Sequence, residues 1–335
     1  MDGTALEANI PTPWLTCVLA STTLSIRTFQ WEDIPALTTL ENEIQIANGS
    51  SSSINKSWLE EYFGQPNLNA AEDCFVYESN NKLNGYALVS PEPAVRRAVL
   101  ELKAYPNTRN HYVEEALIKR SIDRASELGA DVLHIQVDQS SYLHQVLQSS
   151  GFKCARVYLS MRWSLQPFPS PQAPPGFSFR KYGMPGDAGV LANIQNSAFR
   201  GSWGFAPNTA EEIGYRVGMS ITSPDCIIFL CNDHKVTGYS WTLVLKTKST
   251  SVGVISMIGI DPKFRDQRLG RPLLHAGLEH LVSLGVEYVE LEVDESNTPA
   301  IRLYHSVGFR EIQPRQWYEA SIADHVPPHT STNPG

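Results

Sequence analysis

The feature that most constrains this chain is an internal repeat. Two strand-like segments with alternating apolar and polar residues each carry an arginine, and these arginines, Arg27 and Arg180, are 153 positions apart. Gly85 and Gly238, each followed by a tyrosine at the start of another strand-like run, are separated by the same 153 positions. A shared order of segments with constant offsets predicts two tandem copies of one structural unit.

A proline-rich stretch separates the two copies. Residues 164–176 contain five prolines, which disfavour both a helix and a central strand and predict an extended linker. We call the copies before and after it the first unit and the second unit. The predicted organisation is an N-terminal extension, the first unit, the linker, the second unit and a disordered tail, at residues 1–21, 22–163, 164–176, 177–322 and 323–335.

The order of segments within each unit favours an α/β fold. In the second unit, an apolar run at residues 254–260 ends at Asp261 and Pro262, and the helical pattern that follows ends near Gly285. A strand-like segment at residues 286–293 and another short helical pattern come next. A strand, a helix and a further strand in this order predict a crossover connection between two parallel strands. The first unit repeats the order.

Composition argues against several classes of protein. A net charge of −8 argues against a nucleic-acid partner, and no apolar run is long enough to cross a membrane. The first residues lack the basic group of a secretory signal. Five cysteines without metal-ligand spacing predict a reducing compartment and no metal site. We therefore expect a cytoplasmic protein without a bound metal.

The bend before the long helical pattern of the second unit carries the most specific chemistry. Arg265, Arg268 and Arg271 surround Gly270 where the pattern begins. A helix N-terminus presents unpaired N–H groups and the positive end of the helix dipole. Glycine permits close approach of a ligand to the backbone, and arginines donate well to phosphate oxygens. The bend therefore predicts an anion site that suits a diphosphate.

These residues resemble the coenzyme-A-binding loop of GNAT N-acyltransferases, whose usual form is Arg/Gln-x-x-Gly-x-Gly/Ala after a strand. Residues 291–309 resemble the family's next strand and helix. The residues that match in order are Asn297, Ala300, Leu303, Tyr304, Gly308 and Phe309. The tandem layout, with the segment at 196–213, is similar to mycothiol synthase and its relatives. The resemblance implies an α/β fold of two tandem GNAT-like domains, each a mixed, mostly antiparallel twisted sheet flanked by helices, with a splayed parallel strand pair.

The resemblance also implies an activity. It suggests an acyl-CoA-dependent N-acyltransferase with acetyl-CoA as co-substrate, a small-molecule amine as acceptor and the second unit as the catalytic one. The amine would attack the thioester directly while a backbone N–H polarises the carbonyl, and Tyr304 would protonate the departing thiolate. Glu292 would act as base through water, or the amine would arrive neutral. The residues implied in donor binding are Ile258, Gly259, Ile260, Arg265, Asp266, Gln267, Arg268, Leu269, Gly270, Arg271, Asn297, Ala300 and Arg302.

The sequence departs from the family pattern in both units. In the second unit, Arg268 replaces the first loop glycine, and Val254 stands near the place where relatives often carry a glutamate base. In the first unit, the corresponding loop has no glycine and contains Glu114 and Glu115, which would repel a diphosphate. We therefore interpret the first unit as a degenerate copy that shapes the acceptor cleft or supports the second unit.

The acceptor side is less specific. The candidates for it are aromatic residues in or near the second unit's loop, Trp203, Phe205 and Trp241, which alternatively belong to the core. Two other functions stay open: a non-catalytic acyl-CoA-binding or regulatory protein, and a transferase that uses aminoacyl-tRNA. A monomer and a homodimer are both compatible with the sequence.

Overall fold

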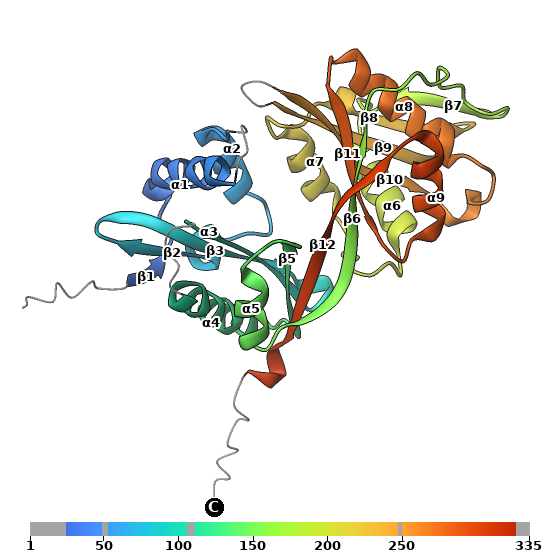
Figure 1. The fold of residues 1–335 in the computed structure, drawn as a ribbon. Helices are drawn as coiled ribbons and strands as arrows, with labels where there is room; N and C mark the ends of the chain where they lie inside the picture. The colour runs from blue at the N-terminus through green and yellow to red at the C-terminus, as the bar shows by residue number, and fades with distance from the viewer. Residues whose placement is uncertain (1–24, 49–52, 106–110, 247–249, 326–335) are drawn as a thin grey trace, which may run out of the picture.

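The computed structural model describes residues 25–48, 53–105, 111–246 and 250–325 (Figure 1). The predicted N-terminal extension and residues 326–335 of the predicted tail lie outside the described residues. Within the described part of the chain, no helix has both the length and the apolar character needed to cross a membrane. The helices and strands given below all lie within these ranges.

The first unit alternates strands and helices. Its strands are β1 Ser25–Thr28, β2 Cys74–Ser79, β3 Lys82–Glu92, β4 Arg97–Ala104, β5 Val132–Asp138 and β6 Lys153–Trp163. Its α-helices are α1 Ile34–Ala47, α2 Lys56–Phe63, α3 Ala70–Asp73, α4 His111–Glu127 and α5 Leu143–Ser149. Two short 3-10 helices are η1 Trp31–Asp33 and η2 Pro93–Val95.

The second unit repeats this order. Its strands are β7 Phe177–Lys181, β8 Ile227–Asn232, β9 Lys235–Lys246, β10 Ser251–Ile260, β11 Tyr288–Asp294 and β12 Arg310–Ser321. Its α-helices are α6 Asp187–Phe199, α7 Ala210–Gly218, α8 Gly270–Ser283 and α9 Thr298–Val307. Its 3-10 helices are η3 Pro224–Cys226, η4 Pro262–Phe264 and η5 Ile322–Asp324.

The same buried ion pair joins the first strand and first helix of each unit. The Arg27 guanidinium donates to the Asp33 carboxylate at 2.7 and 2.8 Å. Arg180 donates to Asp187 at 2.8 and 2.9 Å. Both carboxylates are buried, and burial, the largest single effect, would raise the pKa of each. Hydrogen bonds from the arginine partner and from backbone N–H groups, together with the arginine charge, outweigh it, so the pKa of each carboxyl is lowered. The repeat seen in the sequence is therefore also a repeat of contacts.

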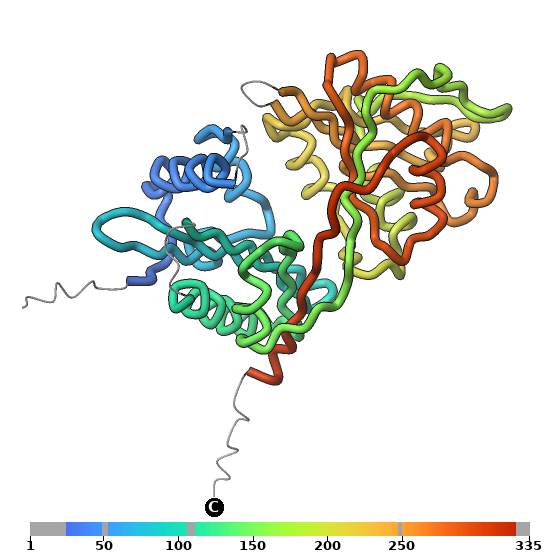
Figure 2. Tube along the Cα trace, in the orientation of Figure 1, coloured from blue at the N-terminus to red at the C-terminus, as the bar shows by residue number. Residues whose placement is uncertain are grey.

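The two units share one continuous sheet of 12 strands, in the order β1-β2-β3-β4-β5-β12-β6-β11-β10-β9-β8-β7. Strand β12, from the end of the second unit, lies between β5 and β6, and β6 pairs in turn with β11. Figures 1 and 2 show these two long strands crossing between the lobes. Each unit thus completes its sheet with a strand from the other, a pairing that the sequence patterns did not predict.

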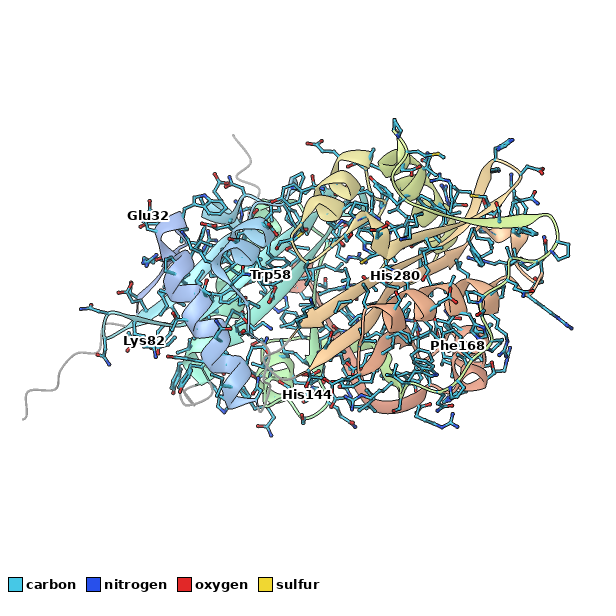
Figure 3. All side chains as sticks on the ribbon, turned by 90° about the horizontal axis from the view of Figure 1, so that it is seen from above. Glu32, Trp58, Lys82, His144, Phe168 and His280 are labelled. Carbon is cyan, nitrogen blue, oxygen red and sulfur yellow. The ribbon has the colours of Figure 1, made fainter. Side chains whose placement is uncertain are left out.

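Helices cover both faces of the sheet in each unit. In the first unit, α1 and α2 bury apolar side chains against one face, and α4 and α5 do so against the other. In the second unit, α6 and α7 cover one face, and α8 and α9 cover the other. Seen from above, the two units lie side by side (Figure 3). The helices of the second unit hold the strands that form the candidate site.

Each unit contains one parallel strand pair that separates along its length. In the second unit, β10 pairs with β11 only at residues 252–254, and a bulge follows in β10 between Ile255 and Met257. In the first unit, β4 pairs with β5 only at residues 97–100. All other pairings in the sheet are antiparallel. The prediction of mixed, mostly antiparallel sheets with splayed parallel pairs is confirmed.

Candidate active site

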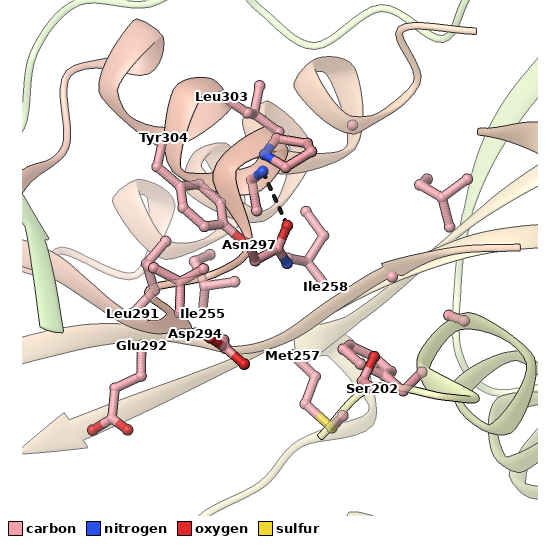
Figure 4. Close-up of a pocket in the computed structure, with 18 of the residues that line it drawn as sticks. Ser202, Ile255, Met257, Ile258, Leu291, Glu292, Asp294, Asn297, Leu303 and Tyr304 are labelled. Carbon is pink, nitrogen blue, oxygen red and sulfur yellow. Dashed lines mark hydrogen bonds between the residues drawn. The ribbon is translucent and has the colours of Figure 1, made fainter. Parts of the chain in front are cut away.

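A large pocket passes through the gap between the separated ends of β10 and β11. Its volume is about 1750 Å³, and its lining runs from the start of α8 to the loop between α6 and α7. In Figure 4, Tyr304 and Asn297 lie on one side of the two strands, and Glu292 and Met257 lie on the other. We call these the donor side and the acceptor side. The pocket connects them.

Four arginines converge where α8 begins. Arg265, Arg268, Arg271 and Arg302 all line the pocket and are solvent-exposed. Arg265 Nη2 donates to the carbonyl oxygen of Ala198 at 2.6 Å, and Arg271 Nη2 donates to a serine hydroxyl of α9 at 2.6 Å. These contacts hold two of the guanidinium groups against α6 and α9, the helices on either side of the loop. The arrangement is a cationic site whose donors fit phosphate oxygens.

The backbone of this loop adopts left-handed conformations. Asp266 has a φ of 63° and Arg268 a φ of 59°. The glycine expected at position 268 would adopt this conformation without strain, so the arginine carries a backbone cost of roughly 1 kcal/mol. Gly270 allows α8 to approach α9 closely, because a Cβ there would lie 3.1 Å from a Leu303 methyl group. The loop therefore adopts its left-handed turn with an arginine, and not a glycine, at position 268.

We expect Arg268→Gly to weaken acetyl-CoA binding about fivefold, equivalent to about 1 kcal/mol for a partly solvated charge. The melting temperature should change little, because relief of the left-handed strain is offset by the larger entropy of glycine in the unfolded chain. Calorimetry and thermal unfolding measure the two effects. Arg268→Gln, which removes the charge and keeps the strain, should lose the same affinity. Tighter binding by Arg268→Gly would mean that the arginine hinders the ligand.

Beyond the point where β10 and β11 separate, the edge of β10 that faces β11 has no strand partner among the described residues. Ile258, Gly259 and Ile260 pair with β9 on one side, and no described strand pairs with them on the other. The free backbone groups can hydrogen-bond an extended ligand chain that carries amides, as the pantetheine arm does. This edge would fit the pantetheine arm of the coenzyme A that the resemblance to GNAT enzymes implies.

Tyr304 lies on the donor side with its ring packed against Phe309, at a centroid distance of 5.8 Å. It is 6% exposed, and burial raises the pKa of its hydroxyl to about 12. No described residue hydrogen-bonds this hydroxyl. Tyr304 therefore keeps its proton at neutral pH and has it available for transfer.

Glu292 lies on the acceptor side, and both its carboxylate oxygens accept hydrogen bonds. Arg315 Nη1 donates to Oε1 at 2.7 Å, and Gln136 Nε2 donates to Oε2 at 3.0 Å. Arg315 comes from the exchanged strand β12, and Gln136 comes from β5 of the first unit. The carboxylate thus ties the second unit to the first. Val254 stands near the place considered for a glutamate base in the sequence, and its side chain provides no carboxylate.

The loop between α6 and α7 reaches across to the first unit. Trp203 stacks on His134 of β5, with ring centroids 4.9 Å apart and an interplanar angle of 10°. The next residue, Gly204, accepts a 2.7 Å hydrogen bond from Arg97 of β4 through its carbonyl oxygen. A second ring, Trp317 of β12, meets Trp203 edge-on at 5.8 Å. The first unit therefore fixes one wall of the acceptor side.

Most of the residues predicted for the site line this pocket. The donor-side residues that do so are Ile258, Gly259, Ile260, Arg265, Asp266, Arg268, Leu269, Gly270, Arg271, Asn297, Ala300 and Arg302. Gln267 is exposed and is not part of the lining. Asn297 also caps α9, because its Oδ1 accepts the Ala300 N–H at 3.3 Å. Tyr304, Glu292, Trp203 and Phe205 line the pocket as well.

The position of Trp241 differs from the prediction. Trp241 is 5% exposed, packs in the core between the sheet and the helices α6 and α7, and lies outside the pocket lining. Its place on β9 puts the ring under those helices, because alternate strand residues face the same side. The interpretation as a core residue, which the sequence left open, describes it correctly.

Several pocket residues gave no signal in the sequence. Glu92, Arg156 and Tyr158 belong to the first unit, and Met257 and Asp294 lie on the separated strands. No sequence motif marks Glu92, Arg156 or Tyr158, and their unit was interpreted as a degenerate copy. The strand exchange brings Arg156 and Tyr158 next to β11, and that pairing depends on residues more than a hundred positions away.

The fold and the site together define an N-acetyltransferase of the GNAT type. The model of the "Acetyltransferase (GNAT) family" matches residues 190–309, which contain the α8 loop and Tyr304. The chain belongs to this family, and the proteins it is similar to include mycothiol acetyltransferases and a tandem GNAT protein. The conclusion rests on the sequence of the second unit together with the arrangement of the whole chain.

Relatives of known class cover most of the chain. A mycothiol acetyltransferase of Nocardia farcinica is 30% identical over 243 residues, which are 69% of this chain and 77% of the relative. One of Thermomonospora curvata is 29% identical over 252 residues, 73% of this chain and 80% of the relative.

Two solved structures share the fold. A GCN5-related N-acetyltransferase from Sphaerobacter thermophilus has a TM-score of 0.69 at 20% identity, covering 89% of this chain and 96% of its own. A tandem GNAT protein from the clavulanic acid biosynthesis pathway has a TM-score of 0.68 at 16% identity, covering 89% and 98%.

Proposed function

We propose that the chain transfers an acetyl group from acetyl-CoA to the amine of a small molecule, and that the second unit carries the reaction. The observation that carries the proposal is the pocket through the β10–β11 gap, which joins the arginine-rich start of α8 to the aromatic loop. Donor and acceptor meet in this gap, so the amine attacks the thioester directly. The mycothiol acetyltransferase relatives support acetyl as the transferred group.

A buried carboxylate in the first unit supports assigning the donor site to the second unit alone. Gly129 and Gly285 close equivalent helices 156 positions apart, and the same offset relates Glu114 to Gly270. Glu114 is 2% exposed, and Tyr142 donates a 2.7 Å hydrogen bond to its Oε1. A carboxylate held at this helix start takes the place of an anionic ligand and repels a diphosphate.

Tyr304 is the proposed general acid. The neutral amine nitrogen forms its bond to the acetyl carbon, the carbon–sulfur bond breaks, and the departing thiolate takes the Tyr304 proton. The nitrogen releases its extra proton to water in the pocket, and a proton from solvent restores the Tyr304 hydroxyl. The backbone along residues 258–260 holds the arm of the donor, and one of its N–H groups stabilises the charge that develops on the carbonyl oxygen. The arginines at the start of α8 bind the diphosphate.

The amine is proposed to arrive neutral. Both oxygens of the Glu292 carboxylate already accept hydrogen bonds, one from Arg315 and one from Gln136, so the group is committed to a contact between the two units. Water in the wide pocket can instead carry the ammonium proton away before attack. On this route Glu292 positions β11 against the first unit and takes no proton.

We expect Glu292→Gln to change kcat/KM by less than about fivefold, because only a positioning contact of about 1 kcal/mol is altered. The pH profile of kcat/KM should keep its shape, since it follows deprotonation of the amine itself. Steady-state rates from pH 6 to 10 measure both. A loss of two orders of magnitude or more, with the rise in the profile removed, would instead make Glu292 the base.

The proposal as a whole is tested by thiol release from acetyl-CoA in the presence of a panel of primary amines, together with calorimetry of acetyl-CoA binding. Turnover with at least one amine and binding that requires the α8 arginines are expected. Binding without turnover for every amine would favour an acyl-CoA-binding protein without activity. The absence of any acetyl-CoA binding would remove the proposed donor altogether.

A further inference from the structure

The acceptor side contains one arginine without a partner. Arg156 of β6 lines the pocket and is half-buried. Among the described residues, its guanidinium has no hydrogen-bond or ion-pair partner. Two other arginines, which contact pocket residues without lining the pocket themselves, are both occupied: Arg97 pairs with Glu92, and Arg315 pairs with Glu292 and Asp138. A half-buried cation in a pocket of an acidic protein calls for an anionic partner.

Strand register places Arg156 among the acceptor-side residues. Tyr158 lies opposite Asp294 of β11 and opposite Arg315 of β12. Directly opposed residues share a face of the sheet, and Arg156, two positions from Tyr158, shares it too. This is the face of Glu292 and the opposite of the side that holds Tyr304 (Figure 4). The α8 loop that suits the diphosphate belongs to the donor side, so the donor does not supply the missing anion.

Asp294 is the diagonal neighbour of Arg156 and carries the opposite charge. Its Oδ1 accepts the Ser296 N–H at 2.8 Å, and among the described residues its Oδ2 has no partner. Diagonal neighbours on adjacent antiparallel strands have Cβ atoms about 7–8 Å apart. The two side chains do not pair with each other in the structure. A small molecule with one anionic and one cationic or N–H-bearing group can bridge them.

We infer that the acceptor is an amine that also carries a carboxylate, and that Arg156 binds that carboxylate while Asp294 accepts a hydrogen bond from the amine. The inference rests on the proposed function and names its acceptor class. A doubly charged phosphate fits less well, because Asp294, the diagonal neighbour of Arg156, would repel its second charge. A single carboxylate balances the single free guanidinium.

The test begins with the acceptor that the enzyme itself selects. Isotope-labelled acetyl-CoA is incubated with the full-length protein and a metabolite extract, and the acetylated products are identified by mass spectrometry. Each product is expected to carry a carboxylate. The identified acceptor is then compared with its carboxamide, which keeps the amine and removes the negative charge. The carboxamide should have a KM about 10- to 100-fold higher, as expected for loss of a charge-assisted hydrogen bond.

Two variants separate the acceptor side from the donor side. Arg156→Gln should raise the KM of the acceptor by the same factor as the carboxamide, abolish the preference for the carboxylate and leave acetyl-CoA binding unchanged by calorimetry. Arg156→Lys keeps the positive charge and should therefore restore part of the affinity for the acceptor. Such recovery would show that the loss in Arg156→Gln comes from the missing charge and not from misfolding. Arg302→Gln should show the reverse pattern, with weaker acetyl-CoA binding and an intact carboxylate preference.

The remaining outcomes distinguish failure of the inference from failure of the proposed function. An acetylated product without a carboxylate, or an unchanged acceptor KM in Arg156→Gln, overturns the inference and leaves the acetyltransferase function standing. The absence of any acetylated product, with acetyl-CoA bound, overturns the proposed function and the inference with it.

Discussion

Replacing Gly270 with glutamate is expected to weaken acetyl-CoA binding at least 100-fold. The variant copies into the second unit the carboxylate that the first unit carries at Glu114. The new charge would stand at the start of α8, where the arginines and the helix dipole favour a diphosphate. Repulsion between partly solvated like charges at close range amounts to about 3 kcal/mol, which corresponds to a loss of about 100-fold.

The control for this variant is Gly270→Gln, which has nearly the same size and no charge. A Cβ at this position lies 3.1 Å from a Leu303 methyl group, so some crowding between α8 and α9 is expected from either variant. Calorimetry with acetyl-CoA should show a loss of about tenfold for glutamine, corresponding to mild crowding of about 1.4 kcal/mol. Equal losses for both would make the effect steric, and no loss for either would place the diphosphate elsewhere.

Tyr304→Phe is expected to lower kcat about 100-fold with little change in the KM for acetyl-CoA, which is the usual effect of losing a general acid. Phenylalanine keeps the packing against Phe309 and the surrounding core, so the melting temperature should stay close to that of the unmodified protein. Rapid mixing of the variant with donor and acceptor measures the chemical step, and calorimetry measures donor binding.

The pKa of Tyr304 also predicts how the activity of the enzyme changes with pH. Because burial raises the pKa of Tyr304 to about 12, the acid form persists across the neutral range and activity falls only as the pH approaches that value. Below it, the profile should show no descending limb from this residue. Tyr318→Phe is the matched control, since Tyr318 is 3% exposed and contacts His144 at 3.0 Å. That variant should lose stability and keep kcat. A fully active Tyr304→Phe enzyme would exclude Tyr304 as the acid.

The sequence alone was sufficient for the features that are encoded within short windows. The repeat of Arg27 and Arg180 appears in the structure as two copies of one ion pair. The bend around Gly270 is the start of α8, and most of the predicted donor residues line one pocket. Loop chemistry and alternating strand patterns act locally, so they can be recognised without knowing which segments meet.

The acceptor side was decided by the tertiary structure. Strands β6 and β12 each complete the sheet of the other unit, and this brings Arg156 and the Arg315–Glu292 pair to the edge of the gap between β10 and β11. The same pairing sets Trp203 against His134, while Trp241 is left in the core. Strand partners are selected by the free energy of the whole sheet, including burial of every edge. Local sequence patterns therefore do not determine which strands pair.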